Sequence, residues 1–235
     1  METRALPSMS TEKWPKKQAV DARYKQVLDM LRHDITFGRL KPRERLVEED
    51  LCARFAVGRY VIRAALEELD RMGLVRRRAH RGVIVSDYAP EEVEELYDIR
   101  RILQREAAQR IALPASSAFL AQIEAINADY VRYGLAGELD QAANANDQFH
   151  QLIFNACNNR HLADLIQHYW LKTASIHCYA IATPALAETS RQEHFSIITA
   201  LREAHREEFV RLCVEHMMPA LTAFKNAHGG WPIRT

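Results

Sequence analysis

Glycine and proline are scarce in this sequence, with eight of each among 235 residues, and runs of β-branched residues are few. These residue types build the turns and strands of β-rich folds, so their scarcity favours a mostly helical chain. Hydrophobic residues make up 48% of the sequence and charged residues 27%, which is ordinary for a globular protein. The length allows one large or two modest domains.

Long apolar runs and paired cysteines are also missing. No uninterrupted apolar run approaches the roughly 20 residues that a membrane-spanning helix needs, and the charged, polar start lacks a signal-peptide pattern. We therefore expect no membrane partner. The four cysteines are scattered, with no C-x-x-C pair, which is typical of reduced core residues in a cytoplasmic protein.

The charge is unevenly divided along the chain. The net charge is only +1, but residues 20–88 carry 15 lysines and arginines against 11 acids, whereas residues 91–228 carry 12 against 18. The first part is therefore net +4 and the second net −6. A basic front and an acidic body suit a protein that presents one end to nucleic-acid phosphates.

The stretch from Leu46 to Leu74 predicts two short amphipathic helices joined by a tight turn. Gly58 lies in the turn and tolerates backbone angles that stop a helix. Arg59 and Arg63 are four residues apart at the start of the second helix, so they project together. This pattern is typical of a helix-turn-helix, whose second helix reads base edges in the major groove.

Two short strands, residues 74–77 and 82–85, follow the second helix and predict a β-hairpin wing. From Arg71 to Gly82 there are five arginines and no acid, so the wing is cationic. A surface helical hairpin with solvated arginines is the alternative. The order of helix pair, hairpin and charge favours a winged helix-turn-helix.

Four segments carry a family resemblance: PRERL (42–46), VGRYVIRAAL (57–66), LDRMGLV (69–75) and HRGVIV (80–85). They resemble the motifs of GntR-type bacterial transcription regulators, in the FadR-like branch. The departures are Arg43 for the turn glycine, Gly58 for a serine, Tyr60-Val61 for Thr-Pro and Ala64 for a glutamate. The resemblance implies DNA contacts from Arg45, Arg59, Tyr60, Arg63, Arg81 and Gly82.

Punctuating residues divide the chain into a flexible arm (1–18), a winged helix-turn-helix domain (19–86), a linker (87–90), a helical domain (91–228) and a tail (229–235). The winged domain should open with a helix from Val20 to Gly38. The second domain shows no strand pattern, and we expect helices at about 91–112, 115–132, 138–157, 159–182, 184–203 and 205–227. The fold class is therefore mainly α, with an N-terminal winged helix-turn-helix, its small β-hairpin wing, and a C-terminal all-α bundle.

Polar residues on the apolar faces of the second domain predict a metal site. Asn146 and His150 are four apart and share a helical face, while His194 and His216 lie on later helices among apolar neighbours. Imidazole nitrogen suits zinc and other first-row metals. A buried histidine is more often a hydrogen-bonded core residue than a metal ligand, and spacing alone does not separate the two.

The second domain also resembles the helical FCD ligand-binding domain, whose metal-binding subset is similar to D-x-x-F-H, then H, then about 22 residues, H. Here NDQFH (146–150) and the 22-residue gap between His194 and His216 match. Asn146 stands for the usual aspartate, and Asp147 is one residue off the face. The resemblance implies a divalent metal on Asn146, His150, His194 and His216. Zinc is expected, with nickel or manganese as alternatives.

An anionic effector is the expected ligand of such a metal. Arg100, in LYDIRRILQ (96–104), matches the arginine that this domain aims into its pocket, and it could hold a carboxylate bidentately. The alternative for Arg100 is a surface ion pair with Glu95 or Glu106. Gln104 replaces the family's usual glutamate.

These features predict a transcription regulator, a repressor, that binds a palindromic double-stranded operator as a homodimer held by residues 91–228. A small carboxylate effector in the helical domain would alter operator binding. One alternative is a metal-dependent hydrolase that uses the histidine cluster, although no acid is placed as in H-E-x-x-H. The other is a structural DNA-binding dimer without an effector. We expect no enzyme activity.

Overall fold

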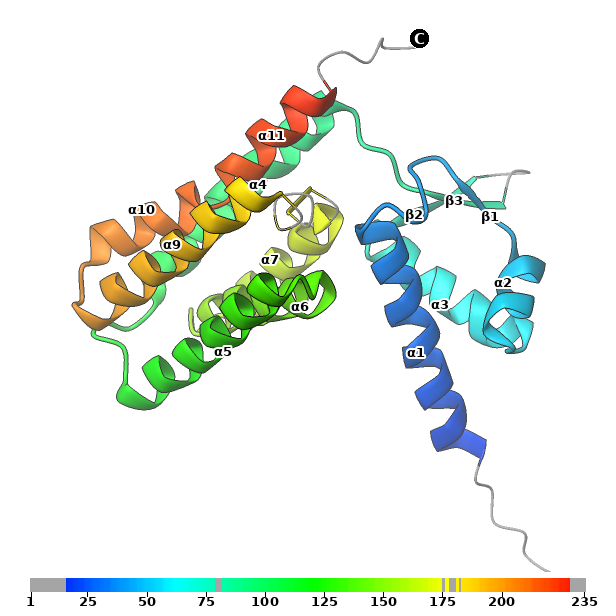
Figure 1. Ribbon diagram of the computed structural model, residues 1–235, viewed down its shortest axis with the longest axis horizontal. Helices are drawn as coiled ribbons and strands as arrows, with labels where there is room; N and C mark the ends of the chain where they lie inside the picture. The colour runs from blue at the N-terminus through cyan, green and yellow to red at the C-terminus, as the bar shows by residue number, and fades with distance from the viewer. Residues whose placement is uncertain (1–15, 79–81, 175, 178–180, 182, 229–235) are drawn as a thin grey trace, which may run out of the picture.

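The computed structural model describes residues 16–78, 82–174, 176–177, 181 and 183–228. Figure 1 shows two bodies, a winged domain and a helical domain, joined by an extended segment between β3 and α4. The expected arm and tail lie largely outside the described residues. The first helix begins at Lys16, inside the expected arm and four residues before Val20.

The winged domain consists of three helices and a small antiparallel sheet. The chain order is α1 (Lys16–Thr36), β1 (Arg45–Leu46), α2 (Glu48–Phe55), α3 (Arg59–Arg71), β2 (Val75–Arg78) and β3 (Gly82–Val85). The sheet order is β1-β3-β2. Leu31, Ile62 and Leu66 have no exposed surface, because α1 and α3 bury their apolar stripes against each other.

The wing is a three-stranded sheet, not the two-stranded hairpin that the sequence indicates. Val75 pairs with Val85 and Arg78 with Gly82, as expected of the hairpin. In addition, Arg45 pairs with Ile84 and Leu46 with Val83. The added strand fixes the position of Arg45 relative to the wing.

The turn between α2 and α3 lies where the sequence predicts it, but the residue that ends α2 is Ala56 rather than Gly58. Ala56 is left-handed, with φ 50° and ψ 46°, and its N–H bonds to the carbonyl of Cys52. Gly58 has φ −73° and ψ 157°, which any residue adopts, and it is the N-cap of α3. Arg43, in place of the turn glycine, is also left-handed at φ 68°.

The helical domain is all-α over its described residues. Its helices are α4 (Pro90–Arg110), α5 (Ser117–Ala136), α6 (Leu139–Asn155), α7 (Arg160–Lys172), α9 (Pro184–Arg202), α10 (Arg206–Glu215) and α11 (Met218–His228). Pro90 opens α4 at a position where its missing N–H is harmless. The core centres on Phe149, Ile153, Ile197 and Phe209.

Two expected helices are interrupted. The helix expected at 159–182 ends at Lys172, and the Thr173 hydroxyl instead bonds to the carbonyls of Tyr169 and Trp170. The helix expected at 205–227 breaks after Glu215, so His216 caps α10 instead of lying within the last helix. Pro219 in the first turn of α11 explains this break, since proline cannot donate to a continuous helix.

The two domains meet where α1 faces α6 (Figure 1). The imidazole of His33 on α1 contacts the carboxylate of Asp140 on α6. Phe37 packs against the cluster around Tyr130 and Ala143, and Ala174 is buried in the core of the winged domain. No helix in the described part of the chain combines the length and apolar character that a membrane crossing requires.

Candidate DNA-binding surface and metal centre

The start of α3 presents a basic, exposed surface. Tyr60 is 79% exposed. Arg59 donates to Glu49 at 2.7 Å, and Arg63 donates to Glu48 at 2.8 Å. Both acids lie in the first turn of α2, so the two arginines are tethered to the preceding helix by exposed, weak ion pairs.

A shallow groove of about 290 Å³ runs between the wing and the start of α2, lined by Arg45, Arg77, Arg78 and Gly82 among others. Gly82 has φ +75°, and an added Cβ would meet only the Nε of Arg45, at 3.9 Å. Glycine is therefore required here by the backbone conformation, in addition to any close approach of DNA. Arg81 lies outside the described residues.

Three histidines from three parts of the helical domain converge. One ligating atom each from His150, His194 and His216 lie within 4.8 Å of one another. The Nε2 atoms of His150 and His216 are 3.1 Å apart. Two nitrogens that share a metal at about 2.1 Å are separated by roughly 3.0–3.4 Å, so this spacing fits joint coordination.

Hydrogen bonds behind the cluster orient two of the rings. The Nδ1 of His194 lies 3.1 Å from the Oδ1 of Asn127, and the Nδ1 of His216 lies 2.7 Å from a carboxylate oxygen of Glu193. Amide and carboxylate oxygens accept a hydrogen bond from a protonated Nδ1. Each Nε2 is then the ring nitrogen with a free lone pair. Of the described residues, His194 has a buried Nε2 without a hydrogen-bond partner.

Burial keeps the rings of His150 and His194 neutral. It lowers the pKa of His150 well below its usual value, assisted by the nearby His216 and His194. Burial also lowers the pKa of His194, assisted by His216. Neutral imidazole is the form that binds metal.

The structure separates the roles of Asn146 and Asp147. Asn146 is 4% exposed and lines the same cavity as His150 and His216. Asp147 instead accepts a hydrogen bond from the Trp170 indole at 2.8 Å. The residue that matches the aspartate position of the resemblance is therefore the one that faces the cluster.

Arg100 is buried in this cavity, with 2% of its surface exposed. Its Nη1 donates to the Thr173 hydroxyl at 2.9 Å, and its guanidinium carbon lies 4.8 Å from both the Tyr97 and Trp170 rings. Its Nε is buried without a hydrogen-bond partner among the described residues. Burial lowers the pKa of Arg100. The burial of Arg100 contradicts the alternative of a surface ion pair.

Sequence reasoning missed the supporting residues Asn127, Glu193 and Thr173. Asn127 and His194 are 67 residues apart, and Arg100 and Thr173 are 73 apart. No local spacing records such pairings. The only signal was compositional, since a polar residue on an apolar helix face, such as Asn127, needs a buried partner.

Comparison with known proteins agrees with both domains. Residues 23–85 match the model of the bacterial regulatory proteins of the gntR family, and residues 95–218 match the FCD domain. The chain is 28% identical over 188 residues to the uncharacterized HTH-type transcriptional regulator YdhC of Bacillus subtilis (strain 168), covering 78% of this chain and 83% of that protein. It is 24% identical over 193 residues to the HTH-type transcriptional repressor RspR of Escherichia coli (strain K12), with 82% and 84% covered.

The solved structure of E. coli McbR/YncC has the same fold, with a TM-score of 0.75 at 20% identity, over 88% of this chain and 98% of that one. A winged helix-turn-helix whose second helix begins with basic residues, joined to a helical domain, defines a DNA-binding transcription regulator. This chain belongs to the GntR family, in the group that carries a C-terminal FCD domain. Proteins of this family are regulators rather than enzymes.

Proposed function

We propose that this regulator holds one divalent metal, zinc, on Asn146, His150, His194 and His216, and that a small carboxylate binds there and alters operator binding. The observation that carries the proposal is the histidine cluster, with its unpartnered, buried Nε2 on His194. A buried polar atom without a partner is destabilising by about 1–3 kcal/mol. A metal ion would give this atom a partner and would also bind the Nε2 atoms of His150 and His216.

The charge of the site favours an anionic ligand. Three neutral imidazoles and one amide oxygen leave the double charge of the ion uncompensated, and the buried guanidinium of Arg100 adds another positive charge. A carboxylate could satisfy both the ion and the free Nε of Arg100. The cavity of about 40 Å³ has room for only a few non-hydrogen atoms in this conformation, which supports a small effector.

The regulator is proposed to act as a repressor and as a homodimer on a palindromic operator. RspR, which is similar over most of its length, is named a repressor. A two-fold DNA site matches a two-fold protein. Ile102 on α4 and Phe195 on α9 are 63% and 56% exposed, and they give the helical domain apolar surface for a partner copy. A monomer by light scattering at micromolar concentration that still bound a full palindrome tightly would contradict the dimer.

Metal content per protomer tests the centre. The parent, purified with metal supplied, should hold about one zinc ion, and His216→Ala should lose it and melt at a lower temperature. His161→Ala is the matched control, because His161 is an exposed residue of α7 outside the cluster. A parent without metal, or a His216→Ala variant that holds as much as the parent, would remove the centre.

A further inference from the structure

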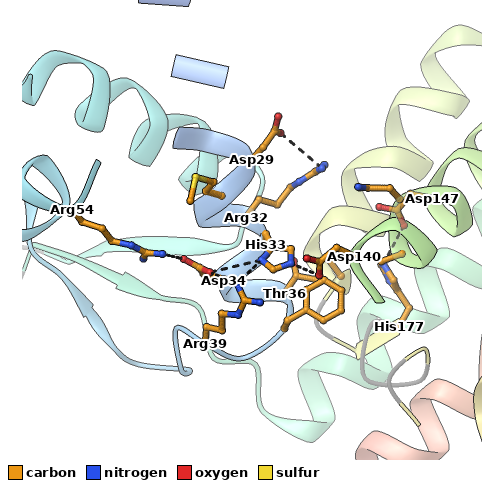
Figure 2. A pocket seen from close by; sticks show the side chains of 15 residues that line it. Asp29, Arg32, His33, Asp34, Thr36, Arg39, Arg54, Asp140, Asp147 and His177 are labelled. Atoms are coloured by element: carbon orange, nitrogen blue, oxygen red, sulfur yellow. Dashed lines mark hydrogen bonds and ion pairs between the residues drawn. The ribbon is translucent and has the colours of Figure 1, made fainter. Parts of the chain in front are cut away.

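His177 lies between two cavities of the helical domain. It lines the metal cavity together with Arg100, His150 and Trp170. It also lines a second, larger cavity of about 540 Å³ between the domains, to which α1 and α6 both contribute side chains. Figure 2 shows His177 beside Asp147 on the helical-domain wall of this interdomain cavity, opposite the α1 side chains.

The imidazole of His177 is buried but poorly satisfied. The residue is 8% exposed, and within the described residues neither ring nitrogen has a hydrogen-bond partner. The Oδ1 of Asp147 lies 3.4 Å from Nε2, which is longer than a normal N–H···O hydrogen bond. Buried donors are nearly always paired, so this arrangement favours a further partner.

On the side of the metal cavity, His177 and Arg100 both lie against the Trp170 ring. The ring centroid of His177 is 4.6 Å from the Trp170 ring, and Arg100 lies over the same indole at 4.8 Å. The Nε of Arg100 is likewise unpartnered in the described structure. One anion in this cavity could therefore accept from both Arg100 and His177.

On the other side, Asp147 belongs to a helix with two functional faces. Asn146 and His150 of α6 line the metal cavity, whereas Asp140 and Asp147 of the same helix line the interdomain cavity. Asp140 contacts His33 of α1. A change in the partners of Asp147 would therefore occur on the helix face that meets the DNA-binding domain.

We propose that His177 is an effector-binding residue that exchanges partners, donating to a carboxylate in the metal cavity when one is present and keeping only its longer contact with Asp147 when none is. The proposal rests on the carboxylate effector proposed above. It adds a second protein donor to the anion site, and it makes the α6 surface that faces α1 sensitive to effector occupancy. The two alternative partners of one buried side chain form the two-state element that coupling between sites requires.

The test uses the full-length, zinc-loaded protein and acetate as the probe, with malonate and citrate as larger carboxylates. Calorimetry measures the affinity of the protein for each carboxylate. Hydrogen exchange reports on residues 33–37, at the end of α1, and on residues 140–147 of α6. His177→Phe keeps a ring beside Trp170 and removes both nitrogens, while His161→Phe is the exposed control. We expect His177→Phe to retain zinc but to weaken probe binding about tenfold or more.

In the parent and the control, saturating acetate should change exchange at residues 33–37 severalfold, whereas His177→Phe saturated with acetate should show no such change. Equal affinity of His177→Phe and the parent, or an unchanged exchange pattern in the parent, would overturn the role of His177 and leave the proposed effector standing. A parent that holds zinc but binds none of the three carboxylates would overturn the proposed effector, and the switch with it.

Asp147→Asn gives an independent test that does not depend on the folding of His177→Phe. The asparagine oxygen can still accept the Trp170 hydrogen bond, but without the charge it competes less for His177. Acetate should then bind about threefold tighter or more, a change of roughly 0.6 kcal/mol. Unchanged or weaker binding by a variant that holds zinc would contradict the exchange of partners.

Discussion

The guanidinium of Arg59 donates to the carboxylate of Glu49 at 2.7 Å, although both side chains are largely exposed. Such a surface pair contributes only about 0.2–1 kcal/mol, whereas a bidentate arginine–guanine contact discriminates by about 1–3 kcal/mol. Exchange of the acid for a base edge is therefore favourable. We predict that Arg59 reads a base, and the pair would then hold the arginine in a defined position until DNA replaces the carboxylate.

Replacement of Arg59 by alanine should cost about 1–3 kcal/mol at the operator and relax base choice. Glu49→Gln should instead tighten binding to any DNA by up to about 1 kcal/mol, since it removes the competing charge. Both are measured by titration of an operator fragment and a scrambled one. Arg132→Ala, which removes an exposed arginine of α5, is the control. Operator affinities within error of the parent for both Arg59→Ala and Arg63→Ala would show that α3 is not the reading helix.

The left-handed residues of the winged domain predict an unusual stability pattern. Ala56→Gly and Arg43→Gly should each stabilise the domain, by up to about 1 kcal/mol, because the left-handed conformation costs an L-residue about 1–2 kcal/mol and glycine recovers most of this. At Gly58 the backbone is ordinary and an added Cβ meets nothing within 4 Å. Gly58→Ala should nevertheless be close to neutral, because the gain of about 0.4–1 kcal/mol from the unfolded chain is offset by the preference of the N-cap position for glycine over alanine. Urea unfolding measures all three, and a destabilised Ala56→Gly variant would contradict the assigned geometry.

The outline of the winged domain could be predicted from the sequence because each signal there is local. The arginine spacing of α3 and the hairpin strands depend on neighbours a few residues away. β1 was missed because it is two residues long and acquires its meaning only by pairing with Ile84, about 40 positions later. The end of α2 was assigned to glycine because glycine usually adopts the left-handed conformation, whereas here Ala56 adopts it and donates its N–H to the Cys52 carbonyl.

The candidate metal site could be predicted only in part from the sequence. Asn146 and His150 follow from helical periodicity, but the convergence of His194 and His216 came from a family resemblance and not from spacing alone. The oxygen atoms that orient those rings, on Asn127 and Glu193, depend on how α5, α9 and α10 pack. Packing of that kind leaves no short-range pattern in a single sequence.

Acidification should destabilise the metal-free protein. The folded pKa values of His150 and His194 lie below the usual value, so below about pH 6.5 the unfolded chain binds protons that the folded chain does not. Stability must then fall as pH drops, with a slope of up to roughly 1.4 kcal/mol per pH unit for each histidine. Urea unfolding from pH 7 to 5 with a chelator present measures this slope.

Removal of one of these two histidines gives the matched comparison. Phe149 stacks on the His194 ring at 3.9 Å, so His194→Phe offers a ring of related shape without a titrating nitrogen. Its stability should depend less steeply on pH than that of the parent. The stability of His161→Phe should keep the part of the pH slope that comes from the buried histidines. A parent with flat stability over this range would show that the cluster does not remain neutral in the fold.

Asn146→Asp should tighten zinc binding and weaken the carboxylate, because the new charge compensates the ion and competes with the anion. Competition with a fluorescent chelator measures the first effect and calorimetry with acetate the second. We expect the affinity for zinc to rise more than threefold and the affinity for acetate to fall more than threefold, because charge-assisted contacts contribute about 1 kcal/mol or more. Asp147→Asn is the comparison variant, because it removes a charge one residue away, outside the cluster, where Asn146→Asp adds one. Unaltered zinc affinity in Asn146→Asp would place residue 146 outside the coordination sphere.

If His216 binds the proposed metal, its position at the joint between α10 and α11 would tie metal supply to the lifetime of the chain. Met217 and Leu221, which follow the joint, pack with Val93 and Tyr97 of α4, the helix that continues from the linker (Figure 1). An ion bound at His216 would anchor the direction in which the last helix leaves the bundle. Without the ion that helix would detach more often, and a detached terminal helix is a preferred substrate of processive proteases. A cell short of zinc would then lower the abundance of the regulator as well as its response.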